Sequence, residues 1–270
     1  MRNILNNFDS AKVWVPVRSS EFVMILRREK LMQASLLLGF IIMFVVLGLD
    51  VQYMLDKLPL LIVTIPLVLV ISFWATALAC FLGLVAALSR LSDRPIYYVP
   101  AKLYVSLFQG MPLIVLLFIL YFGLPHLNPV LLLTPIQAGI IGIALSNGAF
   151  LTEVFRSSVL SVPKGQSEAA RAIGMSSYQK MWRIILPQAA RIALPPTANY
   201  YIFILKDSAL VGFIGVAELF STAQSIGQRD FKILEMLLLA GAVYWIITIV
   251  LSSIQMRLEQ RIETAYSRET

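Results

Sequence analysis

Residues 236–256 read MLLLAGAVYWIITIVLSSIQM, a run without a charged residue. A helix rises 1.5 Å per residue, so about 20 mostly apolar residues cross the roughly 30 Å hydrocarbon core of a bilayer. The run therefore predicts a membrane-spanning helix. The whole chain fits this reading, because 59% of its 270 residues are hydrophobic and 14% are charged, whereas soluble domains have about 25% charged residues. The sequence predicts an all-α polytopic membrane protein.

Five more apolar runs precede this one, which gives about six predicted spans. The earlier five are Leu31–Leu49, Leu60–Leu88, Leu103–Leu124, Ile136–Phe155 and Ile192–Gly215. The run that begins at Leu60 is long enough to require tilt or a kink near Pro66. Lys206 and Asp207 interrupt the run that begins at Ile192, which predicts a break in that helix.

The basic residues predict which side of the membrane each loop occupies. Eighteen of the 22 Lys and Arg residues fall before the first span, between spans two and three, around the loop between spans four and five, or after span six. With six spans these four segments share one side, and the positive-inside rule makes that side cytoplasmic. Both termini are then cytoplasmic. The net charge of +7 follows from this topology, so we expect no nucleic-acid partner.

The composition excludes several kinds of site. A single cysteine, Cys80, leaves no disulfide within the chain, and a single histidine, His126, excludes a histidine-rich metal site. The pattern GxxxxGK[ST] is absent, so the chain has no P-loop for ATP. No secretory signal is expected, because no apolar run precedes Lys30. We therefore expect no catalytic residue, no metal and no cofactor held by this chain.

A polar stretch between the fourth and fifth predicted spans reads EAARAIG at Glu168–Gly174. Gln166–Ile173 favours a helix because it contains three alanines. Gly174 is a predicted C-terminal stop, since glycine adopts the left-handed conformation at little cost. An exposed helix of small residues suits docking into a groove of another protein. The plain alternative is a helical loop that only joins two spans.

A second helix is predicted directly after this one. Ser176 followed by Gln179 is a capping-box signature. We expect the helix to run from Ser177 to about Leu186 and to end at Pro187, because proline ends most helices.

The spacing of these elements resembles the cytoplasmic docking loop of the membrane subunits of ABC importers, E-A-A-x-x-x-G, nine residues, then I-x-L-P. Over roughly residues 60–256 the chain is similar to the polar amino acid uptake subfamily of these permeases. The matching stretches are Leu82–Arg90, Tyr104–Leu113, Tyr121–Pro125, Glu153–Arg156, Val162–Gln166 and Lys206–Leu210. Two of them depart from the family, which usually has Arg-Gly-Thr-Pro at Gln109–Pro112 and often has Lys-Asp-Thr-Ser-Leu at Lys206–Leu210. The family usually has five spans, so 31–49 looks like an added helix.

The resemblance implies a type I importer permease fold in a bacterial inner membrane. It divides the chain into a cytoplasmic or interfacial segment (1–30), the added helix (31–49), a permease domain (60–256) with an ATPase-docking loop (157–190), and a cytoplasmic tail (257–270). It implies a second permease subunit, identical or homologous, and a cytoplasmic ABC ATPase dimer that binds ATP and Mg²⁺. An external solute-binding protein would deliver the polar amino acid. The docking residues are then Gln166, Glu168, Ala169, Ala170, Arg171 and Gly174.

Polar residues inside predicted spans are candidates for the transport path, because such residues usually face a cavity or a neighbouring helix. They are Gln109, Asn147, Glu153, Lys206 and Asp207. Each also has a structural reading: Gln109 lies at a kink, Asn147 packs, Glu153 pairs with Arg156 along one helix, and Lys206 and Asp207 form a salt bridge that holds a broken helix.

The other class we consider is an ion-coupled secondary transporter of a small polar solute. That class needs intramembrane acids and usually has internal repeats. Glu153 and Asp207 are the two acids that qualify, and the sequence shows no repeat.

Overall fold

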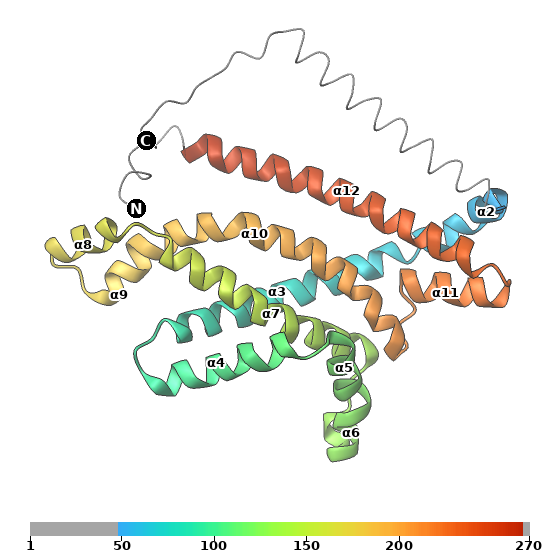
Figure 1. Cartoon of the computed structure of the whole chain (residues 1–270), viewed down its shortest axis with the longest axis horizontal. Coiled ribbons are helices and arrows are strands. Elements are labelled where there is room, and N and C mark those ends of the chain that lie inside the picture. Colours follow the sequence, from blue (N-terminus) through green and yellow to red (C-terminus); the bar gives the residue numbers. More distant parts are fainter. Residues whose placement is uncertain (1–47, 267–270) are drawn as a thin grey trace, which may run out of the picture. The chain divides into compact units, whose positions relative to one another are not determined.

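The computed structural model describes residues 48–266 (Figure 1). The predicted segment 1–30 and the predicted span 31–49 lie outside or almost wholly outside the described residues. The chain divides into two units, 1–50 and 51–270, and the second contains the helical bundle. Every regular element in its described part is a helix, which confirms the all-α prediction.

The α-helices have the following bounds: α2 Val51–Ile62, α3 Ile65–Arg90, α4 Pro95–Gly110, α5 Leu113–Phe118, α6 Leu124–Leu127, α7 Pro135–Leu160, α8 Lys164–Ala172, α9 Ser177–Lys180, α10 Leu186–Asp207, α11 Leu219–Arg229 and α12 Ile233–Tyr266. Wider π-helical turns form η1 (Ile119–Gly123) and η3 (Met181–Ile185), and tighter 3₁₀ turns form η2 (Pro129–Leu131) and η4 (Ser208–Ile214).

Three helices form the centre of the bundle, with α7 packed against both α3 and α10. The largest fully buried side chains there include Ile71, Ile143, Leu151 and Ile204. Small residues bring α3 and α7 into close contact, as they do between many membrane helices. A Cβ atom added at Gly83 would lie 2.9 Å from the Cβ of Leu151.

Three helices are long and apolar enough to cross a membrane within the described residues, namely Ile65–Arg90, Pro135–Leu160 and Ile233–Arg257. They correspond to the predicted runs beginning at Leu60, Ile136 and Met236. A turn at Val63–Thr64, just before Pro66, separates α2 from α3. This interruption of the helix confirms the predicted kink. The last helix, α12, continues to Tyr266, so much of the predicted tail 257–270 extends it.

The predicted span Leu103–Leu124 contains the kink that was considered at Gln109. It crosses a bend of 105° between Pro95–Gly110 and Leu113–Leu127, which reach spanning length only as a pair. The bend lies at Met111, whose backbone is extended at φ −98° and ψ 127°. The residue before a proline avoids the helical region, and Pro112 follows. Because α10 carries Arg191, Lys206 and Asp207 and contains Pro195 and Pro196, it is not among the three apolar spans.

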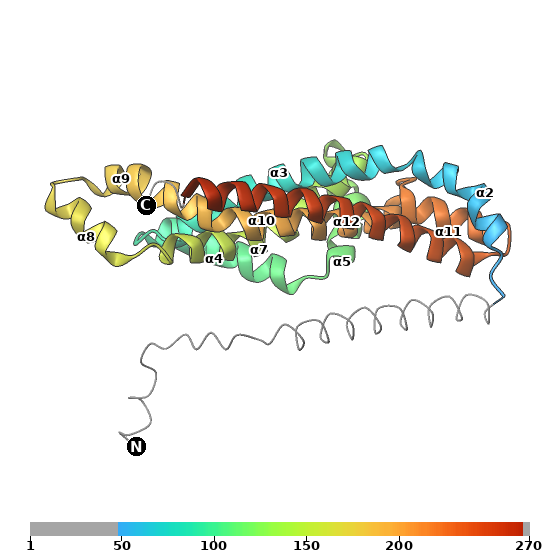
Figure 2. The same cartoon turned by 90° about the horizontal axis from the view of Figure 1, so that it is seen from above.

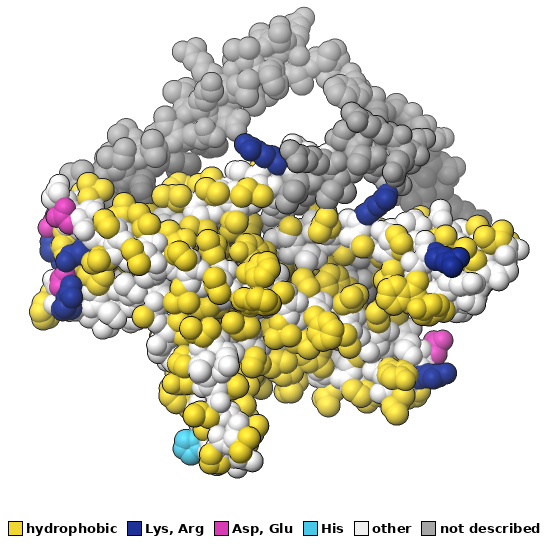
Figure 3. Space-filling model, turned by 180° about the vertical axis from the view of Figure 1, so that it is seen from behind, with side chains coloured by type: hydrophobic (Ala, Val, Ile, Leu, Met, Phe, Trp, Pro, Cys, Tyr) yellow, Lys and Arg dark blue, Asp and Glu magenta, His cyan; other side chains and the backbone are white. Residues whose placement is uncertain are grey.

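Different elements lie at the two ends of the bundle (Figures 1 and 2). One end holds α8 and α9, the turn between α3 and α4, and the far end of α12; the other holds α2 and α11. Three of the basic segments recognised in the sequence therefore share one end. Figure 3 shows hydrophobic side chains over the middle of this face, with most of the visible charges toward the ends.

Candidate functional site

The predicted docking helix, α8, projects at one end of the bundle (Figure 1). Glu168, Ala169 and Arg171 are exposed along it. Ala170 is instead buried, with 3% of its surface accessible, and α8 packs against η3. Ala170 therefore lies on the side that holds α8 to its own loop, and the other three face outward.

The end of α8 is fixed by a glycine, as the sequence predicted. Gly174 has φ +78°, and its N–H donates to the carbonyl of Arg171 at 2.9 Å. The N–H of Met175 donates to the carbonyl of Ala170 at 3.0 Å. These two bonds form the Schellman motif, which closes a helix sharply and satisfies its last carbonyls.

The second helix of the loop begins as predicted and ends elsewhere. Ser176 and Gln179 exchange both bonds of a capping box. The predicted end at Pro187 is wrong, because α9 continues through η3 directly into α10. Leu186 donates its N–H back to Met181, five residues earlier, and this wide turn makes room for the proline ring, which would clash in an ordinary helix.

Two of the predicted path residues meet inside the bundle. Asn147 of α7 is 5% exposed, and its Nδ2 donates to Oδ2 of Asp207 at 3.0 Å and to the carbonyl of Ile143 at 3.1 Å. Asp207 is the last residue of α10, and η4 follows at once. The predicted break in the helix is therefore present, and a polar contact with α7 lies at it.

Lys206 does not join this contact. It is exposed and lines a separate hollow with Ala240 and Tyr244 of α12. No ion pair joins Lys206 to Asp207 within the described residues, so the salt bridge considered as a structural reading of these two residues is not formed.

The remaining two candidates contact neighbouring helices. Gln109 of α4 donates through Nε2 to the carbonyl of Ala149 on α7 at 3.1 Å. Glu153 pairs with Arg156 at 2.9 Å, as the sequence predicted. Its other oxygen pairs with Arg90 at the end of α3. Glu153 thus ties α3 to α7 near the end where α8 lies.

Sequence reasoning missed one buried carboxylate. Glu218 is fully buried and accepts hydrogen bonds from the N–H groups of Phe220 and Ser221 at 2.8 and 2.7 Å and from the hydroxyl of Tyr244 at 2.8 Å. It caps α11 and joins it to α12. An acid directly before a short amphipathic helix was the available signal, since acids favour helix N-termini.

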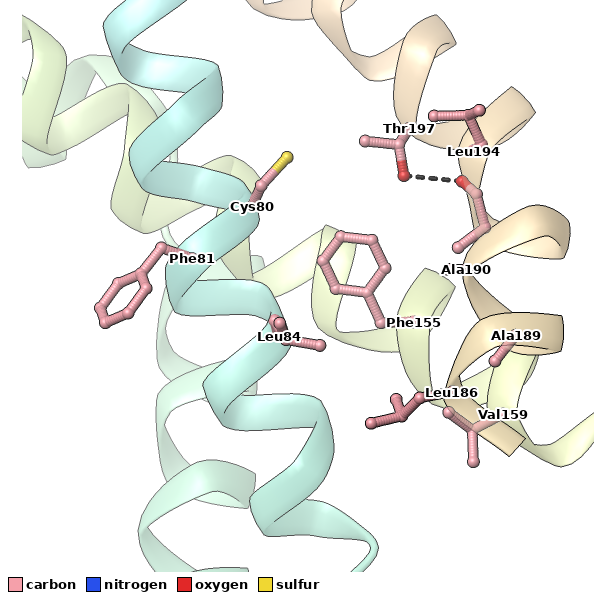
Figure 4. Close-up of a pocket in the computed structure, with 11 residues that line it drawn as sticks. Cys80, Phe81, Leu84, Phe155, Val159, Leu186, Ala189, Ala190, Leu194 and Thr197 are labelled. Carbon is pink, nitrogen blue, oxygen red and sulfur yellow. Dashed lines mark hydrogen bonds between the residues drawn. The ribbon is translucent and has the colours of Figure 1, made fainter. Parts of the chain in front are cut away.

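A cavity of about 360 Å³ lies between α3, α7 and α10 (Figure 4). Its lining is almost wholly apolar, and the ring of Phe155 stands in its centre. The hydroxyl of Thr197 donates to the carbonyl of Ala193 at 2.7 Å and is thereby satisfied. Cys80 lies at the margin of the cavity, where a partly buried thiol packs as a small apolar side chain. This cavity offers no groups for a polar amino acid.

Comparison with known proteins places these features in a family. Residues 79–264 match the model of the binding-protein-dependent transport system inner membrane component. The chain is 38% identical over 218 residues to the probable amino-acid permease protein YxeN of Bacillus subtilis, covering 80% of this chain and 97% of that protein. It is 36% identical to the glutamine transport system permease protein GlnP of Escherichia coli, covering 76% and 94%.

A solved structure agrees. The crystal structure of an amino acid ABC transporter with histidines matches at a TM-score of 0.73 with 30% identity, and covers 79% of this chain and 99% of that chain. The family match, the relatives and this structure together identify a permease subunit of an ABC importer. The chain belongs to the family of binding-protein-dependent transport system inner membrane components.

Proposed function

We propose that this permease carries a polar amino acid, which an external solute-binding protein delivers and a partner ATPase drives inward. Several relatives support the substrate class: YxeN is called a probable amino-acid permease, GlnP serves glutamine transport, and TcyB of Bacillus subtilis serves L-cystine transport. The family membership favours this reading over an ion-coupled secondary transporter.

The observation that carries the proposal is the exposed, rigidly capped α8. It offers Glu168, Ala169 and Arg171 to a partner, together with Gln166, while Ala170 and Gly174 fix its shape. The large side chains of Ile173 and Tyr178 beside it are 74% and 72% exposed. Apolar and aromatic side chains left in water next to a charged helix are typical of a protein contact. We assign this surface to the ATPase, which would supply the ATP and Mg²⁺ site, since the sequence contains no P-loop pattern.

The path itself is assigned to the polar residues between α4, α7 and α10. Asn147, Asp207 and Gln109 form polar contacts on α7, next to the apolar core of the bundle. The break after Asp207 leaves backbone groups outside the regular helix, which membranes tolerate where protein or a water-filled path covers them.

A charge reversal tests the docking assignment. Glu168→Lys should leave the protein inserted and folded, because Glu168 is exposed, while it lowers ATPase association or uncouples hydrolysis from uptake by about tenfold, the scale of a central interface residue. Association is measured by co-purification and coupling by uptake of labelled amino acids into proteoliposomes.

The matched control is Asp93→Lys, the same charge reversal at an exposed position of the turn between α3 and α4. It lies at the same end of the bundle and outside the docking loop (Figure 1). It should keep both association and uptake. Normal transport in Glu168→Lys, or equal losses in both variants, would count against docking by α8.

A further inference from the structure

The turn between α11 and α12 holds a residue in a conformation that favours glycine. Phe231 has φ +56° and is the single non-glycine residue with positive φ among those described. Its N–H donates to the carbonyl of Gln228 at 3.4 Å, and the N–H of Lys232 donates to that of Gly227 at 2.8 Å. These are the two bonds of a Schellman motif, in which the position of Phe231 is usually glycine because a Cβ atom is unfavourable there.

The ring of Phe231 stands almost free of the protein. It is 95% exposed, more than any other large hydrophobic side chain in the described part of the chain. Its neighbours are Gln228, Arg229, Asp230 and Lys232. A stretch of this polarity belongs in water and not among lipid tails, and the aromatic residues that favour the bilayer interface are mainly Trp and Tyr.

The base of the turn is held firmly. Asp230 accepts from the hydroxyl of Tyr53 at 2.9 Å and from Nζ of Lys57 at 3.2 Å, both on α2. It also accepts from Nε of Arg229 at 2.8 Å, and these donors, Arg229 first, hold the pKa of Asp230 well below its usual range. A Cβ atom added at Gly227 would lie 2.9 Å from Cα of Ile233. The turn is therefore tied to α2 on one side and tightly packed on the other.

The position of this turn indicates what kind of partner it meets. It lies with α2 and α11 at the end of the bundle away from α8 and α9 (Figures 1 and 2). If α8 faces an ATPase in the cytoplasm, the turn faces the outside. In Figure 3, acidic and basic side chains lie together at that end. The matching family is described as binding-protein-dependent, and the proposed function brings the solute-binding protein to the membrane from the outside, at this end.

We propose that Phe231 is an anchor for the solute-binding protein: its ring enters an apolar pocket of that protein, and the ion pairs of Asp230 form the polar rim. This inference rests on the proposed function. An aromatic anchor inside a polar rim is the usual form of an interface hot spot. It also accounts for the backbone strain, because glycine would relax the turn and remove the ring.

Three substitutions separate the effect of the Phe231 ring on binding from the effect of its strained backbone. Phe231→Gly removes both, Phe231→Ala removes the ring and keeps the positive φ, and Phe231→Tyr keeps the ring. The permease is assembled with its ATPase in nanodiscs, and the probe is the solute-binding protein that stimulates the wild-type complex. We expect its affinity and its stimulation of ATP hydrolysis to fall about tenfold or more in the Gly and Ala variants and to change less than about threefold in Tyr.

Two further measurements, the basal rate of ATP hydrolysis and the Tm, accompany the affinity measurement. ATP hydrolysis without the binding protein should stay at the wild-type rate in all three variants, and the Gly variant should have an equal or higher Tm because the strain is released. The control is Leu55→Ala, which shortens a side chain that is 56% exposed on α2 at the same end and should keep its affinity.

Each other outcome overturns the proposal. It is overturned if Phe231→Gly binds the binding protein as the wild type does, or if Leu55→Ala loses as much affinity. A photo-reactive benzoylphenylalanine at position 231 should cross-link the binding protein; cross-linking to lipid, with affinity unchanged in the Gly variant, would make the ring a membrane anchor instead. If no binding protein stimulates the wild type, the proposed function has failed, and that result is distinct from a failure of the Phe231 variants.

Discussion

Lys206 and Asp207 are adjacent in the sequence, but their side chains contact different parts of the bundle. Successive residues of a helix point about 100° apart, so Asp207 reaches Asn147 on α7 while Lys206 lines a hollow beside α12. The two charges therefore have separable roles. A carboxylate that receives one amide donor inside the bundle retains accepting capacity, which a transported ammonium group could use.

Neutralising the two charges singly and together is the test at this scale. Asp207→Leu should lower amino acid uptake by about tenfold or more, because it removes a hydrogen bond to a charged group, worth about 1.5–3 kcal/mol. Lys206→Met should have a smaller effect, and the double variant should resemble Asp207→Leu. Uptake and selectivity are measured in proteoliposomes at matched protein amounts. Normal uptake and selectivity in the double variant would remove the pair from the path.

At the residue scale, the sequence shows which positions in the apolar runs are polar more readily than it shows which residues they contact. Asn147 and Asp207 stand out because they are polar within apolar runs, and both are part of one contact. The partner of Glu153 could be predicted only in part: Arg156 lies three residues away on the same helix, whereas Arg90 lies on α3 and reaches Glu153 only through the packing of α3 on α7.

At the scale of elements, glycines set the distance between α3 and α7. A Cβ atom added at Gly148 would lie 2.7 Å from the hydroxyl of Tyr104 and 3.2 Å from the carbonyl of Ala79. The second contact is with backbone, so a rotamer change cannot relieve it. A Cβ atom added at Gly241 of α12 would meet no atom within 4 Å apart from its chain neighbours and the backbone of its own helix.

This difference gives a matched pair of substitutions. Gly148→Ala should lower the free energy of unfolding by about 1–3 kcal/mol, as overpacking does. Gly241→Ala should raise it by up to about 1 kcal/mol, because alanine is the better helix former. Unfolding in mild detergent, followed by circular dichroism, measures both. Equal stability of the two variants would contradict the close approach of α3 and α7.

Local rules account for the elements that could be predicted. The stop at Gly174 and the capping box of Ser176 depend on a few neighbouring residues, and both are confirmed. The end at Pro187 was wrong because a π-helical turn lies just before the proline and the helix continues through it. The kink at Gln109–Pro112 could be predicted, whereas its size, a bend of 105°, could not. In both cases proline signals a disturbance without specifying its form.

At the scale of the whole molecule, the two ends of the bundle should lie on opposite sides of the membrane. Residue 55 lies in α2 and residue 170 in α8, at opposite ends (Figures 1 and 2). We expect reporter fusions at residue 170 to be cytoplasmic and those at residue 55 to be external, because the basic residues cluster at the α8 end. The control is a fusion after residue 266, which should match residue 170. Residues 55 and 170 reporting the same side would refute this topology.

The segments α9, η3 and α10 follow one another without a break, and this affects how motion of the docking loop can reach the inside of the helical bundle. A helix resists compression along its axis, and the 22 residues of α10 extend about 33 Å. Had Pro187 ended the helix, a hinge would separate the docking loop from the bundle, and motion of the loop would be lost in it. We therefore expect a displacement imposed on α8 to reach the break at Asp207, beside Asn147, because α8 packs against η3 and the helix is continuous from there to Asp207.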